Sequence, residues 1–510
     1  MRIAEIRPVP GVAWQQPASA ARRALAGMLL AAALGVVAIA MSVRLPTATP
    51  LVAAAVVAVV LVCAWMLFEP RTELSLAVLM VYLAAADGYL KLKTGQSAAI
   101  LARDLLLYAI AAGALLRALV RGRELRPPPL TSWVVAWVVV VAIQVLNPGA
   151  ASWSHSVLSL RPHLEFVPLF FLGYQVMRSR RRLRVFLLLL LAVTAVNGVV
   201  GLVQFKQTPE QLARWGPGYE TRIAGTGAVS GRGFVDTHGV THNRPFGLGS
   251  DMGFGGSLGA LALPAALALL ALTRRWALRL VAIALSLGAI LAVATSEARV
   301  AVLGSVCAVV AFVLLAISSR NVMRPVVALA VGAALAYTVI STLASSAEPG
   351  AFDRYASIAP DRAANTAYEY RKATLARVPK YVVDVPLGAG LGSSGPGASA
   401  TGGTTAGASL DAESEPTFLL IETGVPGLLV MLGLMVRLLA LAVRRIRWLP
   451  EGELRLLLAG VAAPLFAIFA MGAAGITTAA TPISPYVWFA AGVFAWWLHP
   501  DSRRPVERER

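Results

Sequence analysis

The sequence predicts an all-α polytopic integral membrane protein, and its composition and its hydropathy pattern carry this prediction. The chain has 510 residues, of which 57% are apolar and only 14% are charged, whereas soluble proteins carry about 25% charged residues. The apolar residues form long continuous runs, such as the one from Leu51 to Phe68. A run of about 20 apolar residues crosses a bilayer as a helix, and helix satisfies every backbone hydrogen bond in lipid.

Breaks at charged residues, glycine and proline divide these runs into about 12–14 membrane-spanning helices. In chain order, we expect the spans approximately at residues 24–43, 51–68, 73–88, 98–118, 130–147, 162–177, 184–205, 254–272, 277–295, 299–318, 325–344, 416–442, 454–473 and 484–498. The two shortest of them, 73–88 and 162–177, are near the lower limit for a complete crossing.

Basic residues give the orientation. The net charge is +19, and many of the arginines lie in short connections such as Arg178–Arg184, Arg320–Arg324 and Arg437–Arg455. Short connections rich in Arg face the cytoplasm, so we expect both termini there. This pattern explains the positive charge without a nucleic-acid partner, and none is predicted.

Two longer connections are expected on the opposite, extracytoplasmic face. The predicted organisation is 1–205 N-terminal transmembrane helices, 206–253 first extracytoplasmic loop, 254–344 central helices, 345–415 large extracytoplasmic loop, 416–498 C-terminal helices and 499–510 cytoplasmic tail. The Gly/Ser/Thr-rich part of the large loop, residues 388–410, is expected to be flexible.

Cations at the predicted outer ends of the spans are candidates for ligand binding. Arg299 follows a turn between two spans, and Arg244 precedes a Gly-rich stretch flanked by His242 and Asp251. An Arg at the end of a membrane helix is costly unless it is paired or bound to phosphate. The alternatives are that Arg299 extends to lipid headgroups or pairs with Glu297, and that Arg244 is a surface residue at a helix start.

The large loop adds a third cation and several carboxylates. Arg371 follows Tyr370 in a charged segment, which could equally be a solvated helix. Glu413 and Glu415 precede the span at 416–442, and Glu422 lies about two turns inside it. Carboxylates within spans are functional candidates; the alternative for Glu422 is a structural partner of an Arg or of a backbone turn.

Together these residues suit a lipid-linked diphosphate. Guanidinium groups bind phosphate through paired hydrogen bonds, and a carboxylate beside them could act as general base for a hydroxyl nucleophile. Two cysteines, Cys63 and Cys307, lack the spacing of a metal site, and no Asp-x-Asp pair occurs in a predicted outer loop. No metal or other cofactor is therefore expected.

At these segments the chain resembles the O-antigen ligase and polymerase superfamily of bacterial envelope glycan assembly. The segments that carry the resemblance are Thr295–Arg299, Arg244–Gly247, Tyr370–Arg371 with Pro386–Gly392, and Phe418 with Glu422–Gly427. They occur in the expected order between residues 180 and 445. One departure is the stretch Asp411–Glu415, which lacks the His-Asn pair of O-antigen ligases.

The resemblance implies a glycosyltransferase with GT-C-type architecture in the bacterial cytoplasmic membrane. Its donor would be a polyprenyl-diphosphate-linked glycan, its acceptor a glycan or a lipid, and its surroundings membrane lipids and envelope polysaccharide assembly proteins. Arg299, Arg244 and Arg371 would bind the diphosphate. Glu415 or Glu413 would be the base, with Glu422, Tyr370 and His242 in support. The acidic stretch is more similar to that of the polymerases. The reaction is expected to be metal-independent, because arginines would stabilise the leaving group, and to proceed in one inverting step.

Three alternatives stay open. A ligase would transfer the finished glycan to a lipid or protein acceptor, which the sequence does not separate from polymerisation. A lipid-linked oligosaccharide flippase or transporter also fits many spans and cationic residues, although no internal repeat is visible and transporters place their polar residues near the middle of the bilayer. A scaffold protein of the envelope would not need clustered arginines.

Overall fold

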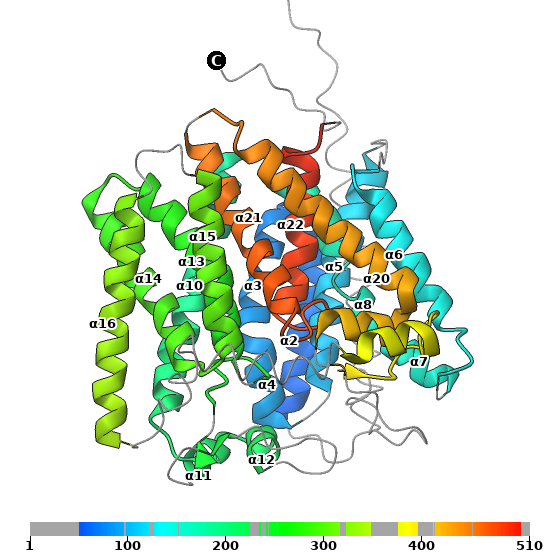
Figure 1. Cartoon of the computed structure of the whole chain (residues 1–510), viewed down its shortest axis with the longest axis horizontal. Helices are drawn as coiled ribbons and strands as arrows, with labels where there is room; N and C mark the ends of the chain where they lie inside the picture. The colour runs from blue at the N-terminus through cyan, green and yellow to red at the C-terminus, as the bar shows by residue number, and fades with distance from the viewer. Residues whose placement is uncertain are drawn as a thin grey trace, which may run out of the picture. The chain divides into compact units, whose positions relative to one another are not determined.

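The computed structural model describes residues 50–95, 98–121, 127–150, 152–224, 234–235, 241–242, 244–251, 253–316, 323–347, 376–395, 412, 414–450 and 452–500. Within these ranges the regular structure is helical, apart from a pair of two-residue strands (Figure 1). The strands β1 (Phe234–Val235) and β2 (Thr241–His242) pair antiparallel, with Phe234 opposite His242.

The helices have the following bounds in chain order: α2 (Pro50–Phe68), α3 (Thr72–Val81), the π-helical turn η1 (Tyr82–Ala86), α4 (Asp87–Thr94), α5 (Ala98–Val120), α6 (Thr131–Gln144), α7 (Trp153–Ser159), α8 (Arg161–Leu164), α9 (Pro168–Val176), α10 (Arg180–Phe205), α11 (Pro209–Ala213), α12 (Pro217–Ala224), α13 (Phe254–Leu272), α14 (Trp276–Thr295), α15 (Arg299–Ala316), α16 (Met323–Ala347), α20 (Glu415–Leu441), the π-helical turn η2 (Ala442–Ile446), α21 (Glu453–Gly472) and α22 (Ile483–Trp497).

Seven of the described helical segments are long and apolar enough to cross a membrane, which confirms a helical, polytopic membrane protein. They are Thr72–Thr94, Arg180–Phe205, Phe254–Leu272, Trp276–Thr295, Arg299–Ala316, Glu415–Ile446 and Glu453–Gly472. Shorter apolar helices occur at Val57–Phe68, Thr131–Gln144 and Met323–Leu335. The larger count of 12–14 spans, the GT-C-type architecture and the orientation of the termini stay predictions, and the predicted span 24–43 lies outside the described residues.

Two predicted spans differ in detail from the helices. The stretch 162–177 is divided into α8 and α9 by a turn at residues 165–167. Pro168 accounts for the break, because a proline has no amide hydrogen to donate to the carbonyl four residues before it; Val167, the residue before it, keeps helical dihedral angles. The stretch 73–88 continues through η1 to Thr94, so that Asp87 lies inside a helical segment and not at its end.

Two compact units divide the chain and are described separately. The first comprises residues 1–76 and 104–125, and within its described part Arg117 Nη1 donates to the carbonyl of Leu67 at 2.8 Å, while its Nη2 donates to Thr72 Oγ1 at 3.1 Å. The second comprises residues 77–103 and 126–510 and contains all the described candidate residues. The predicted boundaries of the loops and helical regions remain a prediction.

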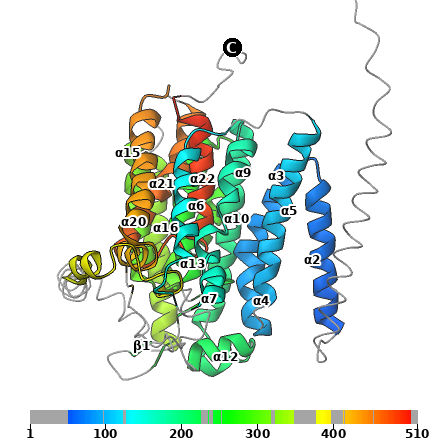
Figure 2. The same ribbon diagram turned by 90° about the vertical axis from the view of Figure 1, so that its right-hand side faces the viewer.

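Small residues let the helices of the second unit approach closely. A Cβ on Gly198 of α10 would collide with the carbonyl of Gly288 in α14, and one on Gly256 of α13 would collide with the Ser296 hydroxyl. Figure 2 shows α9 beside α22, where a Cβ on Gly492 would meet the carbonyl of Phe170. Close backbone approach at small residues is the usual packing mode of membrane helices.

The candidate residues gather at one end of the second unit, drawn at the bottom in Figure 1. We call it the site end: α4, α10, α14 and α21 finish there, and α13, α15, α20 and α22 begin there. The opposite end carries the beginnings of α10, α14 and α21 and the end of α22.

Candidate functional site

Helix α20 is broken at the site end. Ser414 caps its first turn by accepting from the amide of Thr417, and Glu415 is its first residue. Gly424 then adopts φ +69° and ψ −172°, which interrupts the helix just before Pro426. Only glycine adopts this backbone conformation without strain. The first two turns of α20 therefore form a short separate helix whose last residues expose backbone groups.

A tight segment of the large loop satisfies those backbone groups. We call residues 386–395 the glycine corner, because Gly388, Gly390, Gly392 and Gly395 all have positive φ there. The amide of Ala389 donates to the carbonyl of Ile421 at 2.7 Å, and the amide of Val425 donates to the carbonyl of Pro386 at 2.9 Å. The flexible segment predicted at 388–410 is thus hydrogen-bonded to α20 over its first part, while 396–411 lies outside the described residues.

Helix α6 supports the corner from the other side. Gln144 Nε2 donates to the carbonyl of Leu387 at 2.7 Å, and Asn147 Nδ2 donates to the carbonyl of Gly388 at 3.0 Å. Asn147 also donates to Gln144 Oε1 at 2.8 Å, so the two amides hold each other in place. These polar residues at the end of a short apolar helix were not recognised as part of a site from the sequence.

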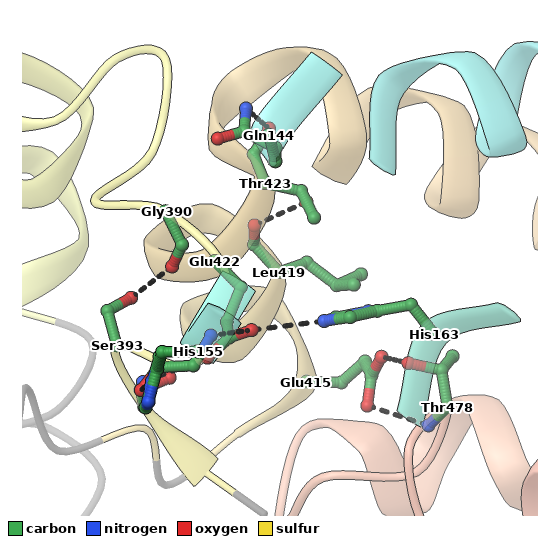
Figure 3. Close-up of polar contacts among 12 residues, drawn as sticks. Gln144, His155, His163, Gly390, Ser393, Glu415, Leu419, Glu422, Thr423 and Thr478 are labelled. Carbon is green, nitrogen blue, oxygen red and sulfur yellow. Dashed lines mark hydrogen bonds and ion pairs between the residues drawn. The ribbon is translucent and has the colours of Figure 1, made fainter. Parts of the chain in front are cut away.

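Glu422 joins the corner to α8, as Figure 3 shows. Its Oε2 accepts from the amide of Gly392 at 3.0 Å and lies 3.0 Å from His163 Nε2, and its Oε1 accepts from the amide of Ser394 at 2.9 Å. The carboxylate is almost completely buried. Glu422 thus contacts two backbone amides and a histidine, and not the arginine that one of the two interpretations expected; its supporting role in the site stays a prediction.

The histidine is itself enclosed by aromatic rings. His163 stacks on Phe418 with a centroid distance of 5.4 Å and an angle of 9°, and the Trp137 indole donates to the His163 carbonyl at 3.2 Å. On α7, His155 Nε2 lies 3.1 Å from the carbonyl of Gly392. A Cβ on Gly392 would collide with His155 Nε2 and with the hydroxyl of Ser159. Two histidines therefore face the corner, and neither was singled out in the sequence.

Glu415 faces the connection between α21 and α22. Its Oε2 accepts from the amide of Thr477 at 2.5 Å, from the Thr477 hydroxyl at 3.1 Å and from the amide of Thr478 at 3.0 Å, while Oε1 accepts from the Thr478 hydroxyl. Both oxygens of this buried carboxylate are thus hydrogen-bonded to one loop (Figure 3). Its assignment as general base stays a prediction; an acceptor hydroxyl would have to replace Thr478.

Arg299 is the first residue of α15 and follows a sharp turn. Ser296 Oγ donates to the carbonyl of Val293 at 2.7 Å and accepts from the amide of Ala298 at 3.3 Å, and Glu297 between them has φ +50°. The Arg299 side chain is half-buried, and its Nε is buried without a hydrogen-bond partner among the described residues. In that part of the chain no ion pair joins Arg299 to Glu297, which was one of the alternatives.

Arg244 lies on a segment that contacts the same turn. The carbonyl of Pro245 accepts from the amide of Gly253 at 3.2 Å, and a Cβ on Gly253 would lie 3.1 Å from that of Ala298. The backbone carrying Arg244 and the backbone carrying Arg299 are therefore neighbours at the site end. That both cations bind one anion stays a prediction.

The buried side-chain amides of two α10 residues bind the segment that follows Arg244. Gln204 Oε1 accepts from the amides of Phe246 and Gly247 at 2.8 Å each, and Gln204 Nε2 donates to the carbonyl of Gly247 at 2.8 Å. Asn197 Oδ1 accepts from the amide of Leu248 at 2.9 Å. Gln204 and Asn197 lie inside an apolar span, and their polarity there was a signal that the sequence analysis did not use.

Four of the predicted site residues are not fully described. His242 belongs to β2, and its side chain lies outside the described part of the structure. Glu413, Tyr370 and Arg371 lie outside the described residues altogether. Their assignments stay predictions.

A buried ionic network is a feature that the sequence analysis missed. Arg103 of α5 forms an ion pair with Glu165 through Nε and donates to it from Nη2 at 2.6 Å, and its Nη1 donates to Asp87 at 3.4 Å and to Thr481 Oγ1 at 3.3 Å. Lys91 lies 2.9 Å from Asp87, and Arg161 lies 3.5 Å from Glu165. Asp87 and Arg103 both fell inside predicted spans, which is the signal that could have found them.

The network and the carboxylates of α20 share their supporting segments. Thr481 belongs to the same α21–α22 connection that donates to Glu415, and Glu165 lies two residues after His163, the partner of Glu422. The described residues contain no group of three or more His, Cys, Asp or Glu arranged to hold a metal ion. The expected absence of a metal is not tested by that finding.

No protein-family model, curated protein or solved structure matches this chain. The fold and the site define a polytopic helical membrane protein with a buried ionic network and two buried glutamates at the site end. The resemblance to the O-antigen ligase and polymerase superfamily stays a hypothesis that rests on the motifs alone.

Proposed function

We propose that this protein is a membrane glycosyltransferase that polymerises or ligates polyprenyl-diphosphate-linked glycan at the extracytoplasmic face. The observation that supports it best is the half-buried Arg299, whose Nε has no hydrogen-bond partner among the described residues, at the first turn of an apolar helix. A guanidinium kept in such a place needs an anion to offset the cost of its burial.

The setting of Arg299 favours a phosphate. The beginning of α15 carries the positive end of an 18-residue helix dipole, and helix N-termini are common phosphate sites. Arg244 lies on the neighbouring segment and adds a second cation. Together they supply the charge and the paired donors that a diphosphate takes, and the predicted contribution of Arg371 would add to them.

The reaction is a single displacement. An acceptor hydroxyl attacks the anomeric carbon, and the bond from that carbon to the diphosphate oxygen breaks. Polyprenyl diphosphate leaves with the electron pair, and the configuration at the anomeric carbon is inverted. The proton of the hydroxyl passes to Glu415 or Glu413. Glu415 is suited to receive a hydroxyl, since two threonine hydroxyls already donate to it, and the arginines stabilise the charge that develops on the leaving group.

A ligase remains the alternative within the same class, because it shares the donor and differs only in the acceptor. A lipid-linked oligosaccharide flippase or transporter is the second candidate, and the break of α20 at Gly424 favours it. Discontinuous helices line the substrate sites of many transporters. Release of polyprenyl diphosphate separates the two classes, since a flippase leaves the donor intact.

The test uses the purified full-length chain with polyprenyl-diphosphate-linked repeat units in the presence of a chelator. We expect the wild type to produce longer glycan and free polyprenyl diphosphate. The rate of glycosyl transfer should be lower by a factor of about 100 or more in Arg299→Gln. Glu415→Gln should lower the rate similarly, while Arg184→Gln at the opposite end should leave it unchanged. Failure of the wild type to release diphosphate from any donor tried would sink the proposal.

A further inference from the structure

A short helix of the large loop carries two apolar faces. Residues 376–384 are helical and lead directly into the glycine corner (yellow in Figure 1). One apolar face packs on the first turns of α20: the buried Tyr381 forms an apolar cluster with Leu420 and Ile421, and Val378 packs against this cluster. This face fixes the helix to the second unit.

The second apolar face is exposed. Val383 has 77% of its surface accessible, and Leu387, just after the helix, has 68%. By the period of 3.6 residues per turn, Val383 lies about 140° around the helix axis from the packed Val378. Water around these side chains would cost about 25 cal/mol for each Å² of apolar area. The second face therefore requires an apolar partner.

The third side of the same helix is charged. Arg377, Lys380 and Asp384 are exposed, and the helical period places them within about 60° of one another. Two cations and one carboxylate give this side one net positive charge. A helix that lies in a membrane interface combines an apolar face with a polar face that carries Lys and Arg. The three sides thus match a helix bound to protein on one side and to a bilayer on another.

The exposed apolar face continues an apolar stripe of α6. This stripe runs along α6 and the turn that follows it, and in a polytopic membrane protein such a stripe faces the lipid tails. Its exposed members are Val135, Val139, Ile143 and Leu146. Gln144, two residues before the end of the stripe, donates from Nε2 to the carbonyl of Leu387 at 2.7 Å. The lipid-facing side of α6 therefore reaches the beginning of the glycine corner.

Helix α7 adds exposed apolar residues at the same corner. Trp153 and Leu158 are exposed, while Ser156 and Ser159 of the same helix are buried. His155 attaches α7 to the corner, with Nε2 3.1 Å from the carbonyl of Gly392. Tryptophan is enriched where a membrane meets water, because its ring is apolar and its indole N–H is polar.

We infer that the helix 376–384, the glycine corner and α7 form one surface that lies in the bilayer interface. Val383 and Leu387 contact the upper acyl chains, and Arg377 and Lys380 lie at the level of the lipid phosphates. Membrane lipid is the occupant, because the apolar face continues the lipid-facing side of α6 and is bordered by cations that complement phosphate. This inference does not depend on the proposed function, since it concerns where the segment lies.

The experiment attaches a nitroxide spin label to single cysteines of the full-length chain in phosphatidylcholine nanodiscs, after Cys63→Ala and Cys307→Ala have removed the native thiols. Oxygen concentrates among the acyl chains and a nickel chelate stays in water, so the ratio of their collision rates with the label measures depth. We expect the labels of Val383→Cys and Leu387→Cys to lie about 5–10 Å inside the headgroup boundary. The label of Lys380→Cys, on the charged side, should lie at that boundary.

Two further positions calibrate the depth. Leu432→Cys, at an exposed position within α20, is the reference for the membrane interior. Glu210→Cys, at an exposed position of the polar helix α11, is the reference for water. A label at Val383 that the nickel chelate reaches as readily as the label at Glu210 overturns the inference. A label at Val383 that both reagents fail to reach shows that protein covers the face, from this chain or a second copy, and overturns it too.

A pair of variants tests whether the apolar side chains hold the segment in the membrane. Val383→Gln with Leu387→Gln should raise the nickel collision rate of a label at Val382 toward that of the water reference. The matched control, Val383→Ile with Leu387→Met, should leave that rate unchanged. Both pairs replace exposed side chains, and an unchanged depth of the Leu432 label in the glutamine pair shows that the chain is folded. An unchanged rate at Val382 in the folded glutamine pair overturns the inference, whatever the glycosyl transfer assay gives.

Discussion

The two ends of the second unit use arginine differently. At the opposite end, Arg184 pairs with Glu453 at 2.6 Å while 52% and 28% of the two side chains stay accessible, and Arg178 stacks over the Trp496 ring at 4.4 Å. At the site end, Arg103 meets Glu165 and Asp87 with 10% or less of each side chain accessible. The opposite end also has a buried arginine, Arg455, which donates to the backbone carbonyls of Ile446 and Arg447. The described carboxylates that meet arginine are thus partly exposed at the opposite end and buried in an ionic network at the site end.

The difference shows where charge has been buried at a cost. An exposed ion pair contributes about 0–1 kcal/mol, so the pair at the opposite end constrains the fold little. Buried ions give up hydration worth several kcal/mol each, and they are retained when every donor and acceptor is satisfied or when function requires them. The site end therefore combines buried charges with the residues predicted to act on substrate.

The largest effect is expected from the centre of the network. Arg103→Gln leaves Asp87 and Glu165 without their main partner and should lower the free energy of unfolding by about 3–5 kcal/mol. Arg184→Gln, which breaks the exposed pair, should lower it by less than about 1 kcal/mol. Denaturant unfolding in a fixed detergent measures both. If both variants lose the same free energy of unfolding, the buried network contributes no more to stability than the exposed pair, and the proposed difference between the two ends is wrong.

The glycine corner gives the next effect. Gly392→Ala places a Cβ against His155 and Ser159 at a residue with φ +81°, and should cost about 1–3 kcal/mol through overpacking and backbone strain. Gly475→Ala is the matched control, because a Cβ there meets nothing within 4 Å and φ is not in the left-handed region. If Gly392→Ala is as stable as this control, the glycine corner accommodates a side chain at residue 392 without loss of stability.

Arg299 should behave opposite to Arg103. The Arg299 side chain makes no hydrogen bond to the described residues through Nε, so Arg299→Gln should change the free energy of unfolding by no more than about 0.5 kcal/mol, as at positions without structural contacts. Its glycosyl transfer rate should nevertheless fall strongly. Thermal unfolding and the glycosyl transfer assay on the same preparation test whether the variant keeps its stability and loses its activity. A destabilisation like that of Arg103→Gln would make Arg299 a structural residue.

The smallest effect concerns an exposed carboxylate near the site end. Hydrogen bonding to Thr208, and then to its own backbone amide, lowers the pKa of Glu210 in α11 below its usual 4.5. A lowered pKa adds stability that is present above 4.5 and is lost as the pH falls through the folded value. Amide exchange in α11, corrected for its intrinsic rate, should therefore speed up slightly below pH 4.5. Glu210→Gln should abolish that dependence.

Part of the candidate site was visible in the sequence. Glu422 was found because a carboxylate two turns inside an apolar run is conspicuous, and Arg299 and Arg244 because both stand beside Gly- or Ser-containing turns. The contacts of Glu422 were not predictable, since His163 lies 259 residues away in the chain. The role of His163 was missed for the same reason: a single histidine within an apolar stretch carries no local sign of its partner.

What the sequence determines by itself is the membrane-spanning character, because hydropathy is a property of about 20 neighbouring residues and needs no tertiary contact. The break in α20 was not predicted, because residues 416–442 were expected to form one span, although Gly424 and Pro426 are residue types that interrupt helices. The tertiary structure alone decides which charges meet: Arg103 reaches Glu165, 62 residues away, and Glu415 reaches Thr477, also 62 residues away. Partners of buried charges are chosen by helix packing, and packing depends on the shape of whole faces that no local pattern specifies.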